Sequence, residues 1–316
     1  MLMQPWAILI RSPVLEPWLK ISKPKKVGLC LNDDLLLGSA RDTQPVSHEA
    51  VEMFSFEHPF DAASKRAIRT HLIKNQLDTA PATIILDPKK YQYFLIDDID
   101  TEEKYKKEAI QWGLTDFLDY PAEDAVIEYI ELPAKNTMQT KKMIYAFAVH
   151  KEVIAHYQAW AADCKINIAQ IDIWQNTIKH LLCDQDALTG VMMIVLRPDM
   201  AEIVIVRNKE IYLLRQLDIS VAKYKFLQEK IEAEAFYNDL CVEIHRTIDF
   251  CTSKIVQPNV SQILLYDDMH LTIDFPKIEE ILGIKIKSIL MDENIQEKNI
   301  DAKFVFAYGA MSGVIS

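Results

Sequence analysis

The chain has 316 residues, of which 50% are hydrophobic and 26% are charged, and its formal net charge is −11. This length predicts two domains, and the composition is that of a globular chain and excludes a disordered one. The acidic balance disfavours a nucleic-acid-binding protein, and a total of only seven glycines disfavours an enzyme that holds phosphates in glycine-rich loops.

The first part of the chain predicts an irregular lead-in followed by a small sheet. Residues 1–26 contain four prolines and are expected to lack regular structure. Apolar runs then predict three strands joined by short turns, at 27–31, 35–41 and 51–56. A helix over 61–76, capped by Asp61, and a buried strand over 82–86 follow. This order is that of ribonuclease H-like and actin-like domains.

Residues 88–150 predict a second module with the order β-α-β-β. Its elements are expected at 91–96, 101–118, 126–132 and 143–149. The helix is expected to present a solvated face where glutamates alternate with its three lysines, Lys104, Lys106 and Lys107. Its Tyr105 and Trp112 are expected in the core, because long amphipathic helices commonly bury aromatic side chains.

The second half of the chain repeats the opening order. A helix over 151–163, a strand over 166–173 and a helix to about Cys183 lead into it. Three strands then follow one another directly, at 191–196, 201–206 and 210–217. A long amphipathic helix over about 221–255 has apolar residues at steps of three and four, namely Phe236, Leu240, Ile244, Ile248, Cys251 and Ile255.

The last predicted elements are a strand, a short helix, a strand and a C-terminal helix, at 261–266, 276–282, 284–290 and from about Asp301. Each half therefore begins with three antiparallel strands and continues into a helix and a parallel strand. This duplication predicts an α/β chain with the actin-like fold.

Four segments resemble the PilM-like proteins: 102–132, 143–173, 240–251 and 304–311. These are cytoplasmic actin-like components of type IV pilus assembly, and their relatives include MshI of MSHA-type pili and the cytoplasmic part of GspL in type II secretion. Within the third segment Glu243, Arg246 and Asp249 match a helix motif of the family.

The resemblance implies a division of the chain into subdomains. Residues 27–87 and 151–187 would form the first actin-like subdomain, and 188–316 the second actin-like domain, with its long helix at about 221–255. Residues 88–150 would form an inserted β-α-β-β subdomain of the type called 1C.

The resemblance also locates a nucleotide site, which in such proteins uses two D-x-G phosphate hairpins and a glycine-rich adenosine loop. In the first hairpin Cys30 and Asn32 stand at the aspartate and glycine positions. In the second hairpin these positions hold Val195 and Arg197, and the adenosine loop has Asp267 and Asp268. Because all three places depart from the pattern, we expect a pseudo-ATPase with no cofactor and no catalytic residues. The rival hypothesis is an atypical site in which Asp33, Asp34 or Asp199 reaches Mg²⁺.

Metal and nucleophile chemistry are not expected. Two helix-spaced pairs, His180 with Cys183 and Cys241 with His245, fall short of the three or four ligands that a zinc site needs. The chain has neither a G-x-S-x-G motif nor a C-x-x-C motif, and its five scattered cysteines are typical of reduced thiols.

By resemblance, the protein is expected to be a scaffold that receives the N-terminal tail of a bitopic inner-membrane partner of the PilN or MshJ type. On the inserted subdomain, the candidates to border this groove are Tyr91, Tyr93, Phe94, Glu108 and Trp112. An assembly ATPase is a second candidate partner, and neither nucleic acid nor a membrane span is expected. The protein would be cytoplasmic and peripheral to the inner membrane through its partner.

Two alternatives stay open. One is an active actin-like ATPase with an atypical nucleotide site. The other is the cytoplasmic domain of a GspL-type secretion protein. Those proteins continue into a membrane span, whereas this sequence ends at Ser316, so a protein of the MshI type is favoured.

Overall fold

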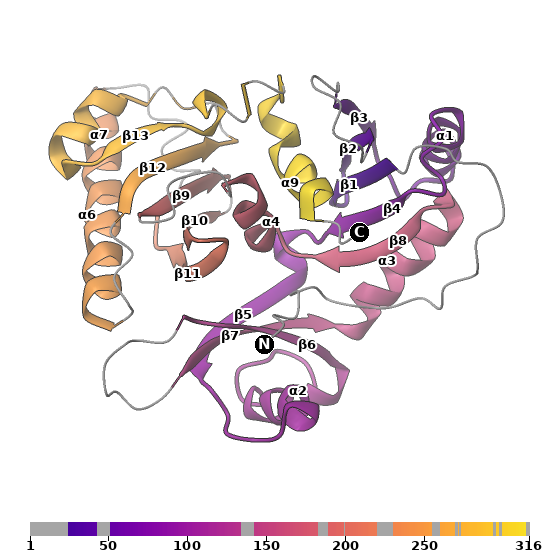
Figure 1. The fold of residues 1–316 in the computed structure, drawn as a ribbon, viewed down its shortest axis with the longest axis horizontal. Coiled ribbons are helices and arrows are strands. Elements are labelled where there is room, and N and C mark those ends of the chain that lie inside the picture. Colours follow the sequence, from indigo (N-terminus) through magenta and orange to yellow (C-terminus); the bar gives the residue numbers. More distant parts are fainter. Residues whose placement is uncertain are drawn as a thin grey trace. The chain divides into compact units, whose positions relative to one another are not determined.

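The computed structural model describes residues 25–42, 51–133, 142–182, 189–198, 200–219, 230–254, 260–268, 271, 273–292, 295–296 and 299–313. Their strands form three sheets (Figure 1). The described residues fall into two compact units. The first comprises residues up to Glu131, between 142 and His180, and from Phe304 onward, and the second is built on residues between Leu181 and Lys303.

The first sheet is mixed and has the strand order β3-β2-β1-β4-β8. Its strands are β1 (Lys25–Leu31), β2 (Leu35–Asp42), β3 (Glu52–Glu57), β4 (Pro81–Ile85) and β8 (Asn167–Asp172). The first three pair antiparallel, whereas β4 pairs parallel with both β1 and β8. The inner strand β4 is buried on both sides from Ala82 to Ile85, as a strand covered on both faces must be.

Helices cover both faces of the first sheet. Helix α9 (Val305–Gly313) packs on β1, β2 and β4, and α1 (Ala62–Lys74) lies on the other side, against α3 (Lys151–Cys164) (Figure 1). The core-facing residues follow the helical period, with Ile68 and Leu72 on α1 and Tyr157 and Trp160 on α3 all buried. The short helix α4 (Trp174–Leu181) follows β8 directly.

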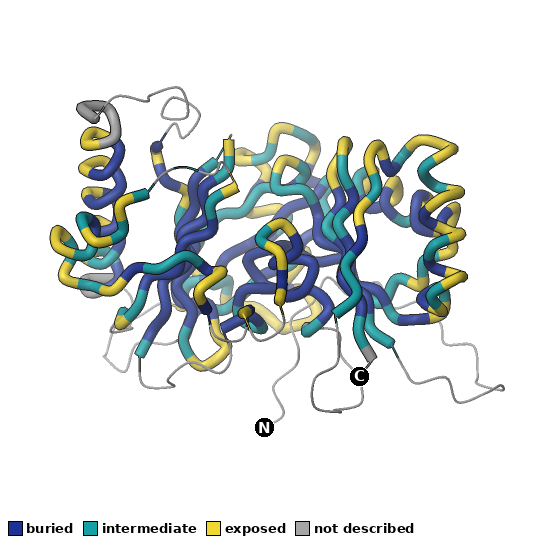
Figure 2. The backbone as a smooth tube through the Cα atoms, turned by 90° about the horizontal axis from the view of Figure 1, so that it is seen from above, coloured by how far each residue is buried: buried dark blue, intermediate teal, exposed yellow. Residues whose placement is uncertain are grey.

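The second sheet repeats this topology with the order β11-β10-β9-β12-β13. Its strands are β9 (Gly190–Arg197), β10 (Met200–Arg207), β11 (Glu210–Leu217), β12 (Val260–Asp267) and β13 (Lys285–Ser288). Again three strands are antiparallel and two are parallel additions, so the predicted duplication is confirmed. Figure 2 shows that the central strands of both large sheets are buried along most of their length.

Two helices accompany the second sheet, α6 (Lys230–Lys254) and α7 (Phe275–Leu282). Of the predicted apolar series on α6, Phe236, Leu240, Ile244 and Cys251 are buried and Ile248 is half-buried. Ile255 lies outside the described residues. The last turns of this unit and the start of the C-terminal segment are 3₁₀ helices, η3 (Ile289–Met291) and η4 (Ala302–Phe304).

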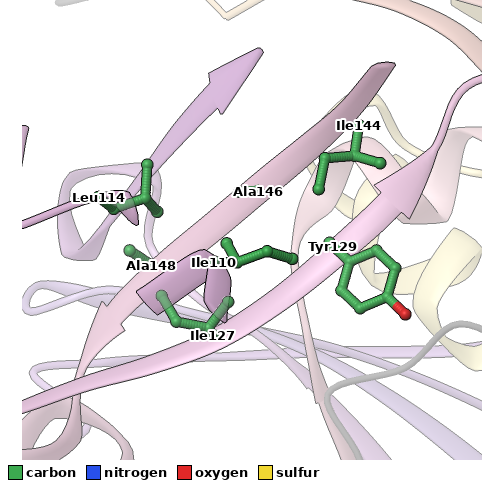
Figure 3. Close-up of a cluster of buried hydrophobic side chains, with 7 residues drawn as sticks. All are labelled: Ile110, Leu114, Ile127, Tyr129, Ile144, Ala146 and Ala148. Carbon is green, nitrogen blue, oxygen red and sulfur yellow. The ribbon is translucent and has the colours of Figure 1, made fainter. Parts of the chain in front are cut away.

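The predicted β-α-β-β module forms a separate three-stranded sheet with the order β5-β7-β6. Its elements are η1 (Pro88–Lys90), β5 (Tyr91–Asp97), α2 (Glu103–Gly113), η2 (Ala122–Asp124), β6 (Ala125–Glu131) and β7 (Met143–His150). All its strand pairs are antiparallel. One face packs against α2 through the buried cluster of Figure 3, namely Ile110, Leu114, Ile127, Tyr129, Ile144, Ala146 and Ala148.

Three expectations for α2 are wrong. The helix ends at Gly113 and not at Leu118. Tyr105 and Trp112 are 50% and 57% exposed instead of buried, because Ile110 and Leu114 supply the core face. Lys106, expected on a solvated face, is 5% exposed and makes ion pairs with Asp98 and Glu131 at 2.9 and 2.8 Å.

Other boundaries differ by a few residues. Asp61 occupies the N-cap position of α1, but its side chain makes no cap hydrogen bond. The expected lead-in up to residue 24, and Cys183 at the expected end of α4, lie outside the described residues. Where the chain is described, no helix combines the length and apolar character that a membrane crossing needs.

Candidate functional site

The turn between β1 and β2 is closed by hydrogen bonds to its own first side chain. The Oδ1 atom of Asn32 accepts from the backbone N–H groups of Asp34 and Leu35 at 3.0 and 2.7 Å. The N–H of Asn32 donates to the carbonyl of Leu35 at 3.1 Å. A phosphate held by this hairpin would need such N–H groups. Here an amide oxygen already occupies the acceptor position.

One carboxylate of this turn, that of Asp33, is also engaged. Asp33, whose side chain is 67% exposed, makes an ion pair of 3.1 Å with Lys90 of η1. Its negative charge is therefore balanced by a cation of the chain itself. Cys30, at the aspartate position, is half-buried in β1, and the hydroxyl of the buried Tyr157 donates to the carbonyl of Leu31 beside it at 3.1 Å. A thiol therefore stands in β1 where the resemblance expects the carboxylate of the D-x-G motif.

The second hairpin, between β9 and β10, turns immediately after Arg197. Val195 is fully buried and pairs with Glu202, and Arg197 pairs with Met200 across the turn. Pro198 has no N–H to offer a phosphate. Asp199, the third carboxylate of the rival hypothesis, lies outside the described residues.

The end of β12 holds the two carboxylates of the expected adenosine loop. The N–H of Asp268 donates to the carbonyl of Leu196 at 3.0 Å, so this backbone extends the pairing with β9. The carboxylate of Asp267 accepts from the N–H of Leu271 at 2.5 Å. The hydroxyl of Tyr266 reaches Asp268 at 3.4 Å. The carboxylates of Asp267 and Asp268 and the N–H of Asp268 thus all make hydrogen bonds within the second unit.

The family-type motif on α6 forms an internal ion-pair network. Glu243 is buried, and its two carboxylate oxygens accept from Arg215 of β11 at 2.5 Å and from Arg246 at 2.6 Å. Arg215 also donates to the hydroxyl of Thr247 at 2.6 Å. Asp249 is exposed. Sequence reasoning missed Arg215, although a charged residue after the apolar run of β11 is a signal that could have pointed to it.

A buried carboxylate that the sequence analysis did not single out lies at the end of β8. Asp172 accepts from the N–H of Ile173 at 2.8 Å and from the side-chain amides of Asn176 and Gln170 at 2.8 and 2.6 Å. Burial raises the pKa of Asp172 to about 6 against these hydrogen bonds and the nearby charge of Lys179. Its signal in the sequence is an aspartate at the carboxyl end of a buried parallel strand.

The five candidates for the partner groove divide between two elements and two faces. On β5, Tyr91 and Tyr93 share one face and lie 6.5 and 5.7 Å from the ring of Phe147. Tyr91 is 8% exposed, and its hydroxyl donates to Gln175 at 2.6 Å. Phe94 points to the opposite face, towards the cluster below α2.

Glu108 and Trp112, the other two candidates, are exposed on α2. They lie one turn apart on that helix, away from the face that carries Tyr91 and Tyr93 of β5. The structure therefore brings together Tyr91 with Tyr93, and Glu108 with Trp112, but it does not unite all five on one surface.

Among the described residues, no group of three or more His, Cys, Asp or Glu side chains could hold a metal ion. Of the two helix-spaced pairs, Cys241 is buried while His245 is exposed, and Cys183 lies outside the described part.

The chain contains two five-stranded sheets of the same topology. In each sheet three strands pair antiparallel and two further strands are added in parallel, and this duplication defines an actin-like fold. By sequence, the chain matches no protein-family model and no curated protein. Among the solved structures that are similar to this chain are two whose own chains it covers almost completely. One is the PilM–PilN type IV pilus biogenesis complex, at 14% identity, with 93% of this chain and 100% of that chain covered and a TM-score of 0.64.

The other is the cytoplasmic domain of EpsL, an inner-membrane component of the type II secretion system of Vibrio cholerae. It is 7% identical, with 91% of this chain and 95% of that chain covered and a TM-score of 0.52. At these identities the similarity establishes the fold. The predicted likeness to PilM and to a GspL-type cytoplasmic domain is thereby confirmed in the fold.

Proposed function

We propose that this protein is a cytoplasmic scaffold of a type IV pilus assembly platform of the MSHA type, and that it docks the N-terminal tail of a bitopic inner-membrane protein. The observation that carries the proposal is the similarity to the PilM–PilN type IV pilus biogenesis complex, which covers 93% of this chain. Docking, not catalysis, is the function of this scaffold.

The turn at Asn32 supports a pseudo-ATPase. A nucleotide would have to displace the side chain of Asn32 from two backbone N–H groups and would still face Cys30 in place of a carboxylate. At the second hairpin, Pro198 removes one donor outright. Breaking these internal hydrogen bonds would lower the affinity for a nucleotide, because its phosphates must also be desolvated.

Calorimetry tests the nucleotide half of the proposal. Titration of the full chain with ATP and Mg²⁺ at millimolar concentration should give only the heat of dilution. The alternative of an atypical ATPase requires saturable heat that Asp33→Asn or Asp34→Asn abolishes. Saturable binding at micromolar concentration would end the pseudo-ATPase proposal and leave the docking proposal standing.

We place the tail beside β5. This strand stands at one end of the order β5-β7-β6, so an extended peptide could add to it as a further strand, while side-chain pockets give selectivity. Tyr93 and Phe94 are half-buried, one on each face, and suit the walls of such pockets, while the buried Tyr91 packs with Tyr93 around Phe147.

A labelled peptide of the N-terminal tail of a PilN-type bitopic membrane protein from the same organism tests the docking half. Binding should reach saturation at micromolar concentration, and Tyr93→Ala should weaken it about tenfold or more, as truncation of an aromatic anchor does. Ile73→Ala, at a residue 50% exposed on α1, is the matched control. Failure of the tail to bind at these concentrations would contradict the proposal.

The similarity to the EpsL domain favours one alternative, a role in a type II secretion platform. The same binding experiment separates the two, with tails of a pilus and of a secretion protein as competitors. Cell fractionation tests the proposed localisation. The protein should sediment with membranes only when the bitopic partner is present.

A further inference from the structure

Helix α2 presents an outward face made of Tyr105, Glu108 and Trp112, which we name the α2 aromatic face. These residues are spaced by three and four, so they lie one above the other along the helix. Ile110 and Leu114 are directed at the sheet instead (Figure 3). Tyr105 is 50% and Trp112 57% exposed, so the face is open to a partner.

Exposed aromatic side chains are concentrated at this helix. Among the large hydrophobic residues that are exposed in the described chain, the three aromatic ones are Tyr105, Trp112 and Phe117, the last 62% exposed just beyond the end of α2. None of the three is part of the buried cluster beneath the helix. Exposed aromatic groups of this kind mark interaction surfaces, because Trp and Tyr are the residues that most often dominate binding energy.

Among the described residues, acidic side chains without an ion-pair partner remain around this face, whereas the lysines of α2 are all paired. Each lysine of α2 already has an acidic partner, with Lys104 bonded to Glu102, Lys107 to Glu128, and Lys106 to Asp98 and Glu131. Lys104 also lies 4.6 Å from the centre of the Tyr105 ring.

By contrast, Glu108 and Asp116 are exposed and make no ion pair with any described residue. Glu108 stands between Tyr105 and Trp112 on the same face, and Asp116 lies in the turn after the helix. The surface therefore combines apolar aromatic area with uncompensated negative charge.

We propose that the α2 aromatic face docks a basic amphipathic helix of a partner protein. Apolar side chains of that helix would pack on Tyr105 and Trp112. A lysine or arginine beside them would pair with Glu108 and lie over the indole ring, which is the strongest aromatic partner for a cation. This surface lies on a different element from the β5 edge, so it does not depend on whether the membrane protein's tail docks there.

The test uses the full chain and two labelled peptides of about 18 residues, long enough to form a helix. One has leucines at helical spacing with lysines elsewhere, and the other has glutamates in place of the lysines. Fluorescence anisotropy should show saturable binding of the basic peptide and none of the acidic one. Trp112→Ala and Tyr105→Ala should each weaken binding about tenfold, and Glu108→Lys by a similar factor.

Glu280→Lys is the matched control, because it makes the same charge change at an exposed residue of α7. It should leave binding within about twofold, which separates the local effect from attraction to the net charge of −11. Equal binding to wild type and Trp112→Ala, equal losses in both charge variants, or no binding of the basic peptide would overturn the proposal. Sedimentation equilibrium adds one more outcome: a dimer that Trp112→Ala dissociates would assign the face to a second copy and overturn it as well.

Discussion

Gly28 lies in β1 where α9 crosses the sheet at backbone distance. A Cβ atom on this residue would stand 1.9 Å from the carbonyl oxygen of Ala307 and 2.5 Å from the amide nitrogen of Met311. Since both are main-chain atoms of a packed helix, relief requires α9 to move. We expect Gly28→Ala to lower the free energy of unfolding by about 3 kcal/mol in urea denaturation. Gly113→Ala, whose Cβ would meet only Ile99 at 3.8 Å, should stay within about 1 kcal/mol of wild type.

Asp172 gives the molecule a residue-level pH dependence. Burial raises its pKa from 3.8 to about 6, so the folded chain holds this proton more tightly than the unfolded chain. Its contribution to stability is therefore complete below pH 3.8 and is lost as the pH rises through about 6. Replacing Asp172 with Asn should remove this dependence, so the difference in unfolding free energy between wild type and variant should change by up to about 1.4 kcal/mol per pH unit in that window. Parallel curves in urea unfolding across the window would contradict it.

Lys106 shows what a residue pattern alone leaves undetermined. Its neighbours Lys104 and Lys107 are exposed, and the sequence places all three among glutamates. Only Lys106 shares the face of Ile110 and Leu114, and its burial depends on Asp98 and Glu131 from other elements. Those acids are not adjacent to it in sequence. The sequence shows the helical period that places Lys106 on the buried face, but it does not show the acidic partners that compensate for burying its ammonium group.

At the scale of elements, Arg215 fastens α6 to β11. Its guanidinium donates to the carboxylate and carbonyl of Glu243 and to Thr247, at 2.5 to 3.1 Å. Arg215→Ala would leave the buried carboxylate of Glu243 with only Arg246, whose side chain is 66% exposed. We expect a loss of about 3 kcal/mol in urea unfolding, since breaking one side of a buried ion pair leaves an uncompensated charge. Arg246→Ala should cost under about 1 kcal/mol, and equal costs would contradict this role for Arg215.

Most elements followed from local patterns. Continuous apolar runs located β4, β9 and β12, because parallel strands covered on both faces need apolar residues throughout. The turns and helix ends were less predictable. Helix α2 stops at Gly113, although Leu114 and Leu118 extend the apolar period, and residues 114–117 form hydrogen-bonded turns instead. Glycine has a low helix propensity, so the apolar period overrode a local signal for the helix end.

The whole molecule is a duplicated fold, and that much could be predicted from the order of its elements. The candidate site could be predicted only in part. The resemblance predicted that Cys30, Asn32, Val195, Arg197, Asp267 and Asp268 depart from a nucleotide motif. It could not show that Asn32 accepts two backbone hydrogen bonds, or that Asp268 extends the pairing of β9 with β12, because both depend on three-dimensional geometry. The sequence likewise could not show that the β5 and α2 candidates lie on two different surfaces. Side chains alternate between the two faces of a strand, but which face of β5 is covered by α2 is known only from the structure.

Thermal unfolding distinguishes a nucleotide-driven machine from a scaffold at the scale of the whole chain. A ligand that binds only the native state stabilises it by about 2.7 kcal/mol at one hundred times its dissociation constant. For domains of ordinary size this raises the melting temperature by several degrees. We expect no shift with millimolar ATP and Mg²⁺, and a shift of several degrees with saturating peptide of the membrane protein's tail. The tail's effect should persist in Asn32→Ala, because that residue closes a turn in the first sheet and does not lie on β5. A rise in melting temperature with nucleotide in the wild-type chain would contradict the pseudo-ATPase proposal, and a rise only in Asn32→Ala would show that this side chain blocks the phosphate position.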